Sequence, residues 1–226
     1  MSLQTPNSRA LVAGGTGRIG AAIAARLEAA GYQVFAAGRA DGDLRTRDGA
    51  QALLAAALAR LGSLDLVVHC AGDGFVPRPV AEVSEDDWAA AMDVTAKGTF
   101  FLAQAAAEPL RESRGVLVIV EDVAAFRPWP VFAPHCAAKA AQAMLTRVLA
   151  EALAPEVRVC GVAPGPVAVE PSQTERRAAE TLLRRVGEPA DVAEAVLYLA
   201  RAPFVTGTSL VVDGGALIKS GIARLP

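Results

Sequence analysis

The sequence is poor in the features that mark several classes of protein. It holds three cysteines in 226 residues, Cys70, Cys136 and Cys160, and none has the CxxC or Cys/His spacing of metal ligands. This argues against a disulfide framework and a zinc site, so no metal is expected. Apolar runs are short, since Arg60 closes the run 52–59, and a membrane span needs about 20 residues. The sequence therefore predicts neither kind of stabilising centre and no membrane segment.

Charge of one sign and a targeting pattern are also lacking. Lysine and arginine number 22 against 24 acidic residues, for a net charge of −2, which does not favour a nucleic-acid partner. Residues 1–9 are polar and lack a basic stretch followed by an apolar one, so no secretory signal is expected. These observations favour a cytoplasmic protein with a small-molecule substrate, bound to neither nucleic acid nor membrane. The 53% of hydrophobic residues suffices for a large core.

Short β-branched runs alternate with alanine-rich stretches of helical period from Ala10 onward. This pattern is typical of repeated βα units around a parallel sheet, and the consecutive apolar positions of VLVIV favour a sheet covered on both faces. We expect an α/β, doubly wound parallel-sheet Rossmann fold in one domain, residues 1–226. The predicted strands are Ala10–Ala13, Gln33–Ala37, Leu64–His69, Val116–Glu121, Val157–Val162 and Ser209–Val212. The predicted helices are Arg18–Ala30, Arg47–Leu61, Glu85–Arg111, Pro134–Ala154, Ser172–Arg185 and Pro189–Ala200. Ser84 and Asp87 predict a capping box, and Gly31 and Gly62 predict helix ends.

One connection is too short for its place in this pattern. Only Arg39–Gly42 separate the second strand from Asp43 and Leu44, which we interpret as a very short third strand. A parallel crossover needs a dozen or more residues. The crossover helix between strands 2 and 3 is therefore predicted to be shortened or missing.

A glycine loop follows the first strand and opens the first helix. Gly15, Gly17 and Gly20 match GxGxxG, and Gly14, Gly17 and Gly20 also match GxxGxxG. Such a loop brings backbone N–H groups and a helix N-terminus to a pyrophosphate. The setting predicts a dinucleotide site, with a tight packing turn as the alternative.

The end of the second strand bears on which dinucleotide binds. An acidic residue there suits the ribose hydroxyl of NAD, whereas an arginine suits the 2′-phosphate of NADP. This position holds Arg39, and Arg18 adds a second cation in the glycine loop. We predict NADP(H), with NAD(H) possible through Asp41.

Further motifs extend a resemblance over nearly the whole chain, from Leu11 to about Ile218. In order they are the glycine loop, Asp43, His69-Cys70-Ala71-Gly72, Met92 to Gly98, His135 to Lys139, Val162 to Val167 and the ending Val205 to Gly215. Together they resemble the short-chain dehydrogenase/reductase family, while Arg18 and Asp122 resemble pteridine reductases. The resemblance implies a homotetramer or homodimer through the helices near Glu85–Arg111 and Pro134–Ala154, and a substrate lid over residues 168–186. It also implies cofactor contacts by Gly14, Thr16, Gly17, Arg18, Ile19, Gly20, Arg39, Asp43, Ala71, Gly72, Lys139, Pro164, Gly165 and Val167.

The catalytic positions depart from the family pattern. The resemblance implies a tyrosine as proton donor, a lysine four residues later, a serine and an asparagine. Lys139 keeps the lysine, but His135 replaces the tyrosine, Asp122 the serine and Thr95 the asparagine. Histidine is a common general acid. The Lys139 cation disfavours imidazolium and the Asp122 carboxylate favours it.

The sequence thus leaves three hypotheses. The first is an NADP(H)-dependent reductase of a small carbonyl, enone or pterin-like substrate, with Asp122, His135, Lys139 and Thr95 as its catalytic residues. The second is a nucleotide-binding regulator or subunit that has lost catalysis. The third is a cofactor-independent lyase or isomerase using Asp122 and His135.

Two segments are candidates for the substrate pocket. Aromatic and proline residues gather between the two catalytic positions, and such a loop is typical of a pocket wall, with core packing as the alternative: Phe126, Pro128, Trp129, Pro130 and Phe132. The lid segment is rich in arginine, which favours either an anionic substrate or a solvated face.

Overall fold

The computed structural model describes residues 8–73, 75–167 and 169–220. Its strands form one six-stranded parallel sheet in the order β2-β1-β3-β4-β5-β6. The strands are β1 (Arg9–Ala13), β2 (Gln33–Ala37), β3 (Leu66–His69), β4 (Val116–Val120), β5 (Arg158–Pro164) and β6 (Ser209–Val212). From β1 the chain adds β2 on one side and then crosses to add β3 on the other side. This is the doubly wound α/β sheet of the Rossmann type, as predicted.

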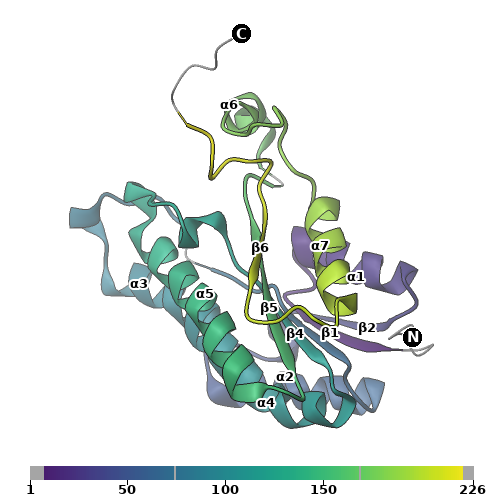
Figure 1. Ribbon diagram of the computed structural model, residues 1–226. Helices are drawn as coiled ribbons and strands as arrows, with labels where there is room; N and C mark the ends of the chain where they lie inside the picture. The colour runs from purple at the N-terminus through teal and green to yellow at the C-terminus, as the bar shows by residue number, and fades with distance from the viewer. Residues whose placement is uncertain (1–7, 74, 168, 221–226) are drawn as a thin grey trace.

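Helices cover both faces of the sheet (Figure 1). On one face α1 and α7 pack on Val12 and Val68, and on the other α2, α4 and α5 pack on Leu11 and Val67. Residues of β3 and β4 are buried throughout, which explains their uninterrupted apolar sequence. The helices are α1 (Arg18–Ala29), α2 (Arg47–Leu61), α3 (Glu85–Met92), α4 (Gly98–Ser113), α5 (Ala133–Leu153), α6 (Thr174–Ala179) and α7 (Pro189–Arg201).

Local signals set several helix ends as predicted. The Ser84 hydroxyl accepts from the Asp87 N–H at 3.1 Å, and the Asp87 carboxylate accepts from the Ser84 N–H at 3.1 Å. Gly31 and Gly62 have φ of +91° and +82°, where a Cβ would be strained. These residues stop α1 and α2.

The connection after β2 contains no α-helix before Asp43, as predicted, and the chain then enters α2. A three-residue 3₁₀ turn, Arg39–Asp41, is the helical structure between β2 and Asp43. The predicted third strand at Asp43 and Leu44 is wrong, because these residues form an irregular loop. The Thr46 N–H donates to the Asp43 carbonyl and turns the chain into α2, while Leu44 is buried in the core beside α2 and α4. The sheet therefore ends at β2.

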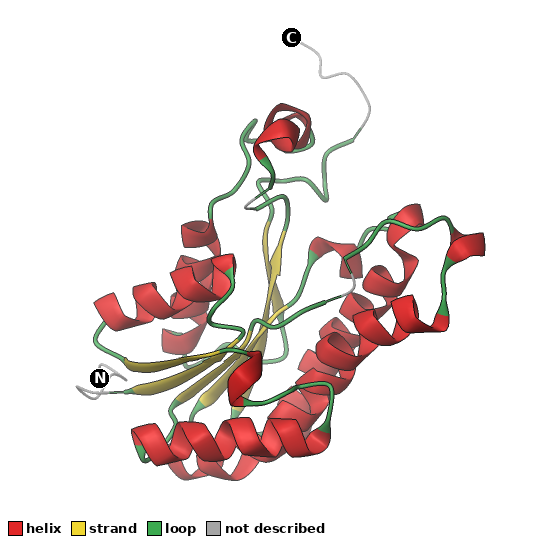
Figure 2. Cartoon of the chain, turned by 180° about the vertical axis from the view of Figure 1, so that it is seen from behind, coloured by secondary structure: helices red, strands yellow, loops and turns green. Residues whose placement is uncertain are grey.

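Two predicted helices are interrupted. The helix expected over Glu85–Arg111 contains one π-helical turn over Asp93–Lys97, between α3 and α4. The helix expected over Ser172–Arg185 ends at Ala179. Beyond it the Leu182 and Leu183 N–H groups donate to the Gly214 carbonyl instead of continuing the helix. The α6 helix stands beyond the carboxyl end of β5 (Figure 2).

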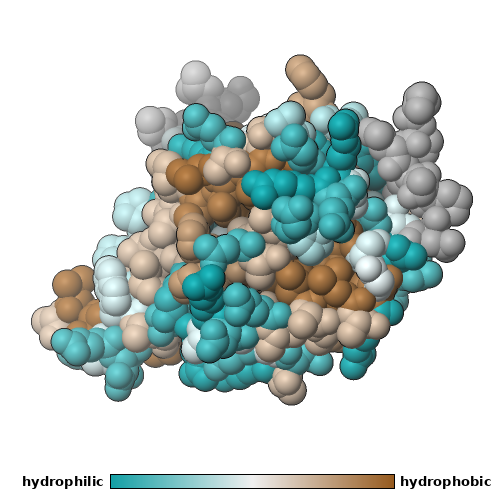
Figure 3. All heavy atoms as spheres, turned by 90° about the horizontal axis from the view of Figure 1, so that it is seen from below, coloured by the Kyte–Doolittle hydropathy of each residue, from teal (hydrophilic) through white to brown (hydrophobic). Residues whose placement is uncertain are grey.

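The face seen in Figure 3 carries hydrophobic side chains in separate patches among hydrophilic ones. Large exposed hydrophobic residues on α3, α4 and α5 include Trp88, Phe100, Met144 and Val148. Within the described ranges, every helix is too short or too polar to cross a bilayer.

Candidate active site

One cleft of about 1120 Å³ lies where β1, β3, β4 and β5 end. A parallel sheet binds ligands at this edge, beside its switch point. The volume exceeds that of a usual small-molecule pocket, which leaves room for a dinucleotide together with a substrate. The lining contains most of the predicted site residues: Gly14, Gly17, Arg18, Ile19, Gly20, Ala71, Gly72, Thr95, Asp122, His135, Lys139, Pro164, Gly165 and Val167. Thr16, Arg39 and Asp43 do not line it.

The glycine loop has the shape of a phosphate cradle. Gly14 has φ of +82° and, with Gly15, donates its N–H to the Ala37 carbonyl at 3.0 and 2.9 Å. A Cβ at Gly20 would collide with the Gly14 carbonyl. Gly17 precedes α1, whose first turn contains no acidic residue, so the positive end of the helix dipole faces the cleft. The loop therefore fits a pyrophosphate.

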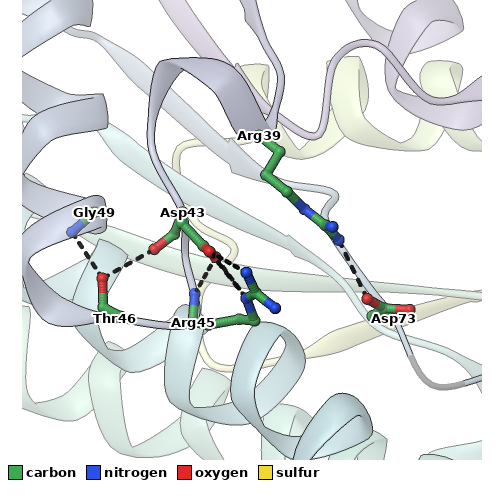
Figure 4. Close-up of polar contacts among 6 residues, drawn as sticks. All are labelled: Arg39, Asp43, Arg45, Thr46, Gly49 and Asp73. Atoms are coloured by element: carbon green, nitrogen blue, oxygen red, sulfur yellow. Dashed lines mark hydrogen bonds and ion pairs between the residues drawn. The ribbon is translucent and has the colours of Figure 1, made fainter.

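Charged residues from two strand ends meet beside this loop. The Arg39 guanidinium follows β2 and lies 3.2 Å from an Asp73 carboxylate oxygen, beyond the end of β3 (Figure 4). Because β1 lies between β2 and β3 in the sheet, the ion pair bridges the strands on either side of the glycine loop's own strand. Asp41 accepts the Gly38 N–H at 2.9 Å and is thereby already engaged. Thr16 packs against Gly38 at the same strand end.

Asp43 has partners of its own outside the cleft lining. Its carboxylate accepts hydrogen bonds from the Arg45 backbone N–H and guanidinium (Figure 4). These bonds lower the pKa of Asp43 to about 2. The Asp43 carbonyl accepts from Thr46. The structure thus gives Asp43 a role in turning the chain into α2.

Asp122 and His135 come together as the sequence predicts. Asp122 follows β4 and caps a 3₁₀ turn, since its Oδ1 accepts the Ala124 N–H at 2.8 Å. Its Oδ2 lies 3.6 Å from His135 Nε2. That separation exceeds a hydrogen bond but allows ion pairing. The capping bond aims one carboxylate oxygen at the imidazole.

His135 sits in the first turn of α5 and is only 7% exposed. Neither ring nitrogen has a hydrogen-bond partner among the described residues. A buried polar atom without a partner costs free energy. The unpaired imidazole, which lines the cleft, is therefore suited to a ligand that supplies the missing bond.

Lys139 is buried and anchored from two sides. Its Nζ donates to the Val120 carbonyl at 3.0 Å and to Gln142 Oε1 at 2.9 Å. Burial lowers the pKa of Lys139, and the charge of Asp122 opposes that shift. Two of the three ammonium donors are thus used, and the third remains for a ligand in the cleft.

Gln142 is a site residue that the sequence reasoning missed. It is fully buried, and its Nε2 donates to Thr99 Oγ1 at 2.8 Å and to the Thr95 carbonyl at 3.3 Å. The same nitrogen lies 3.4 Å from His69 Nδ1. The signal was available as a polar residue three positions after Lys139 on the inner side of a helix. Gln142 links the lysine to the π-helical turn and to β3.

Thr95 and His69 complete this buried network. Thr95 lies in the π-helical turn, where its Oγ1 has no partner among the described side chains. His69 is fully buried, and burial together with the nearby Lys139 cation lowers its pKa to about 4. His69 is therefore neutral at pH 7. It lies at the carboxyl end of β3 and does not line the cleft.

Glu121 is a second residue that was missed. Its Oε1 accepts from Thr146 Oγ1 at 2.6 Å, and burial raises its pKa. A side chain at Gly161 on β5 would overlap this carboxyl. Glu121 thus occupies the space that Gly161 leaves, next to Asp122.

An aromatic cluster, defined here as Phe75, Trp129 and Phe132, surrounds His135. The Phe75 and Phe132 rings stack with centroids 4.5 Å apart, and the Phe75 ring meets the imidazole edge-on at 4.9 Å. Trp129 lies parallel to the imidazole at 6.3 Å. All three rings line the cleft. Phe126, from the same predicted wall, does not.

The lid segment expected over residues 168–186 contributes to the cleft through α6 and the turn before it. Ala168 lies outside the described residues. Arg176 and Arg177 line the cleft, and both pair with Glu180, at 3.2 and 2.7 Å. The Arg177 guanidinium lies 5.8 Å from the Trp129 ring centroid. This segment thus lies against the aromatic cluster through Arg177.

Comparison with known proteins places this geometry in a family. The family model described as enoyl-(acyl carrier protein) reductase matches residues 40–216. A 3beta-hydroxysteroid dehydrogenase 1 from Eggerthella lenta is 34% identical, over 93% of this chain and 94% of the relative. A relative from Xanthobacter autotrophicus, named inactive 2-(S)-hydroxypropyl-CoM dehydrogenase 2, is 37% identical over 73% of this chain and 80% of its own.

A solved structure agrees with these relatives. The short-chain dehydrogenase/reductase described as a glucose/ribitol dehydrogenase from Brucella melitensis superposes with a TM-score of 0.84 at 30% identity, covering 96% of this chain and 99% of the other. The family match, the relatives and the shared sheet agree. The chain belongs to the short-chain dehydrogenase/reductase family of oxidoreductases.

Proposed function

We propose that the protein is an NADP(H)-dependent reductase of a small carbonyl, enone or pterin-like C=N substrate, with histidine as its proton donor. The observation that carries this proposal is the Asp122–His135 pair, 3.6 Å apart in a cleft that also contains the glycine loop and Lys139. A dinucleotide when bound supplies the hydride. The chain's own residues must then supply the proton and hold the reactants.

His135 is the proposed acid and Asp122 its positioning partner. The carboxylate stabilises the imidazolium form and orients the ring, because Ala124 fixes its other oxygen. The imidazolium gives its proton to the substrate oxygen or nitrogen as the hydride arrives, and solvent reprotonates the neutral ring. Apolar neighbours restrict water around His135, which strengthens the Asp122 interaction.

Lys139 and Thr95 hold the reactants in this proposal. The remaining ammonium donor of Lys139 binds the nicotinamide ribose, while Val120 and Gln142 keep the side chain in place. The Thr95 hydroxyl, which lines the cleft, binds a polar group of the ligand or a water beside it.

The preference for NADP(H) rests on charge at the end of β2. Arg39 and Arg18 are the cations expected to meet a 2′-phosphate. Asp41, the residue that best suits NAD(H), already accepts the Gly38 N–H. A 2′-phosphate must compete with Asp73 for the Arg39 guanidinium, so the ion pair weakens the preference for NADP(H) over NAD(H).

The test is NADPH consumption over a panel of ketones, enones, quinones and dihydropterins. Wild type is compared with His135→Ala and with the double change Asp122→Ser with His135→Tyr. The proposal expects turnover in wild type that falls about 10² to 10⁴-fold in His135→Ala. Activity found only in the double variant contradicts it.

A second candidate is a nucleotide-binding regulator or subunit without catalysis. It is favoured by the three catalytic positions that differ from the pattern implied by the family resemblance. The relative from Xanthobacter autotrophicus whose name calls it inactive adds to it. NADPH binding without turnover of any panel compound, in wild type and His135→Ala alike, is the result expected of this candidate.

We propose further that the chain forms a homodimer or homotetramer in the cytoplasm. Exposed hydrophobic residues on the two helices that the family resemblance implicates support this: Phe100 on α4, and Met144 and Val148 on α5. Exposed apolar surface of this kind marks protein interfaces. Sedimentation of wild type and of Met144→Glu with Val148→Glu tests it, since the double variant is expected to dissociate.

A further inference from the structure

The aromatic cluster beside His135 is placed for a particular class of substrate. We infer that the substrate is an aryl carbonyl compound, whose ring packs on Phe75, Trp129 and Phe132 while its oxygen faces His135. This inference rests on the proposed reductase function, which it deepens.

The cluster is built from two distant segments. Phe75 follows β3, whereas Trp129 and Phe132 lie between β4 and α5. The Arg78 N–H donates to the Val131 carbonyl at 2.8 Å and ties the two segments together. The rings therefore form a wall that exists before any ligand arrives.

The wall presents its apolar surface to the cleft. The Phe75 side chain is 55% exposed, although it stacks on Phe132 and lines the cleft. Val76 and Val131 are also exposed and line the same space. Exposed apolar surface in a cleft marks a ligand site. A flat apolar group gains most from covering it.

The ring geometry favours an aromatic group over an aliphatic one. Stacked and edge-on arrangements already occur among Phe75, Phe132 and Trp129, with centroids 4.5 to 6.3 Å apart. Aromatic pairs contribute beyond their area in such arrangements, by a factor that corresponds to roughly 2- to 12-fold in affinity. An added aromatic ring extends the same pattern, whereas a puckered ring of equal size does not.

The position of His135 connects the wall to the chemistry. Its imidazole meets the Phe75 ring at 4.9 Å and faces Asp122 on Nε2. A carbonyl attached directly to a ring on the wall reaches the acid without a spacer. In the reaction the carbonyl carbon gains a hydride from NADPH and the oxygen gains the His135 proton, giving a benzylic alcohol and NADP⁺.

A matched pair of ligands separates ring chemistry from size. The chain has two tryptophans, so Trp88→Phe leaves Trp129 as the only indole and makes its fluorescence a binding signal. The probes are 1-phenylethanol and 1-cyclohexylethanol, titrated without cofactor. We expect 1-phenylethanol to quench Trp129 with an affinity at least about threefold tighter. Equal affinities overturn the inference.

Turnover supplies a second measurement, with acetophenone and cyclohexyl methyl ketone as substrates. Phe132→Leu should erase the preference for the aryl ketone in kcat/KM. Phe126→Leu, in the same loop but outside the cleft lining, should keep it. The two proposals fail differently. Aryl-selective quenching without any NADPH consumption sinks the reductase and leaves the aryl site, while equal turnover of both ketones sinks the aryl inference alone.

Discussion

The two ends of the cleft are formed by different kinds of chemical group, backbone at one end and side chains at the other. At the glycine-loop end, backbone groups and absent side chains shape the site, as the Gly14 carbonyl against Gly20 shows. At the His135 end, the side chains of Lys139 and Gln142 on α5 form a buried network that reaches carbonyl groups of β4 and of the π-helical turn. The first end has the glycines that the family resemblance implies, with Arg18 among them, whereas the second differs from the implied pattern at three of its four positions. A site formed by the backbone tolerates few substitutions, because an added side chain collides with it. In a network of side chains, one substitution can be compensated by another.

The largest expected effect concerns His69 in the network. Its folded pKa of about 4 lies below the usual 6.5, so the unfolded chain binds more protons between these values. Stability attributed to the neutral ring is therefore complete above pH 6.5 and lost as pH falls toward 4. The loss is about 3 kcal/mol.

Denaturant unfolding of wild type and His69→Asn from pH 4 to 7 measures this. The variant should lose about 3 kcal/mol less than wild type over that range. The raised pKa of Glu121 acts in the opposite direction, but it is shared by both proteins and cancels in the difference. Parallel curves would show that His69 does not titrate as the structure implies.

The backbone-built end is tested by Gly20→Ala. Its Cβ would overlap the Gly14 carbonyl, and overpacking of this kind costs about 1 to 3 kcal/mol. Calorimetry of NADPH binding should show at least a tenfold weaker affinity. Ala25→Ser, at an exposed position of the same helix, is the control and should leave the affinity unchanged. Equal losses in both variants would contradict the packing argument.

Gln142→Leu tests the side-chain network. It removes the acceptor of Lys139 and the donor to Thr99, and orphaned buried groups cost about 1 to 3 kcal/mol. We expect that loss in unfolding free energy by urea titration. Gln104→Leu, exposed on α4, should change it by less than about 0.5 kcal/mol. A neutral Gln142→Leu would mean that Lys139 needs no anchor.

The smallest effect is expected at Asp73. Asp73→Asn should release Arg39 from an exposed ion pair worth about 0.2 to 1 kcal/mol. The ratio of NADPH to NADH affinity should then rise by up to about fivefold. Asp48→Asn on α2 makes the same charge change at an exposed residue and should leave the ratio unchanged. A lower ratio in Asp73→Asn would show that Asp73 assists NADPH.

Sequence reasoning reached the parts of the molecule set by local rules. Periodicity, the capping box at Ser84 and the glycines at helix ends predicted the strands and most of the helices to within about two residues at each end. Asp122 and His135 were identified through the family resemblance, and the structure places their side chains 3.6 Å apart.

Non-local packing decided the rest. Asp43 and Leu44 were interpreted as a strand. In the structure they form a loop instead, because Leu44 is buried beside α4 and the chain turns at Thr46. Gln142 is an ordinary helix residue until Lys139, Thr99 and His69 surround it. The π-helical turn at Thr95 likewise depends on contacts made by α5. No local pattern encodes such partners.

The central claim is that His135 delivers the proton. The most direct measurement is the pH dependence of single-turnover NADPH oxidation from pH 5 to 9, with wild type and the Asp122→Ser, His135→Tyr variant. A wild-type rate that falls as pH rises is predicted, because only the imidazolium form can give the proton, while the tyrosine variant keeps its rate to higher pH. A wild-type rate that is flat from pH 5 to 9 would contradict it.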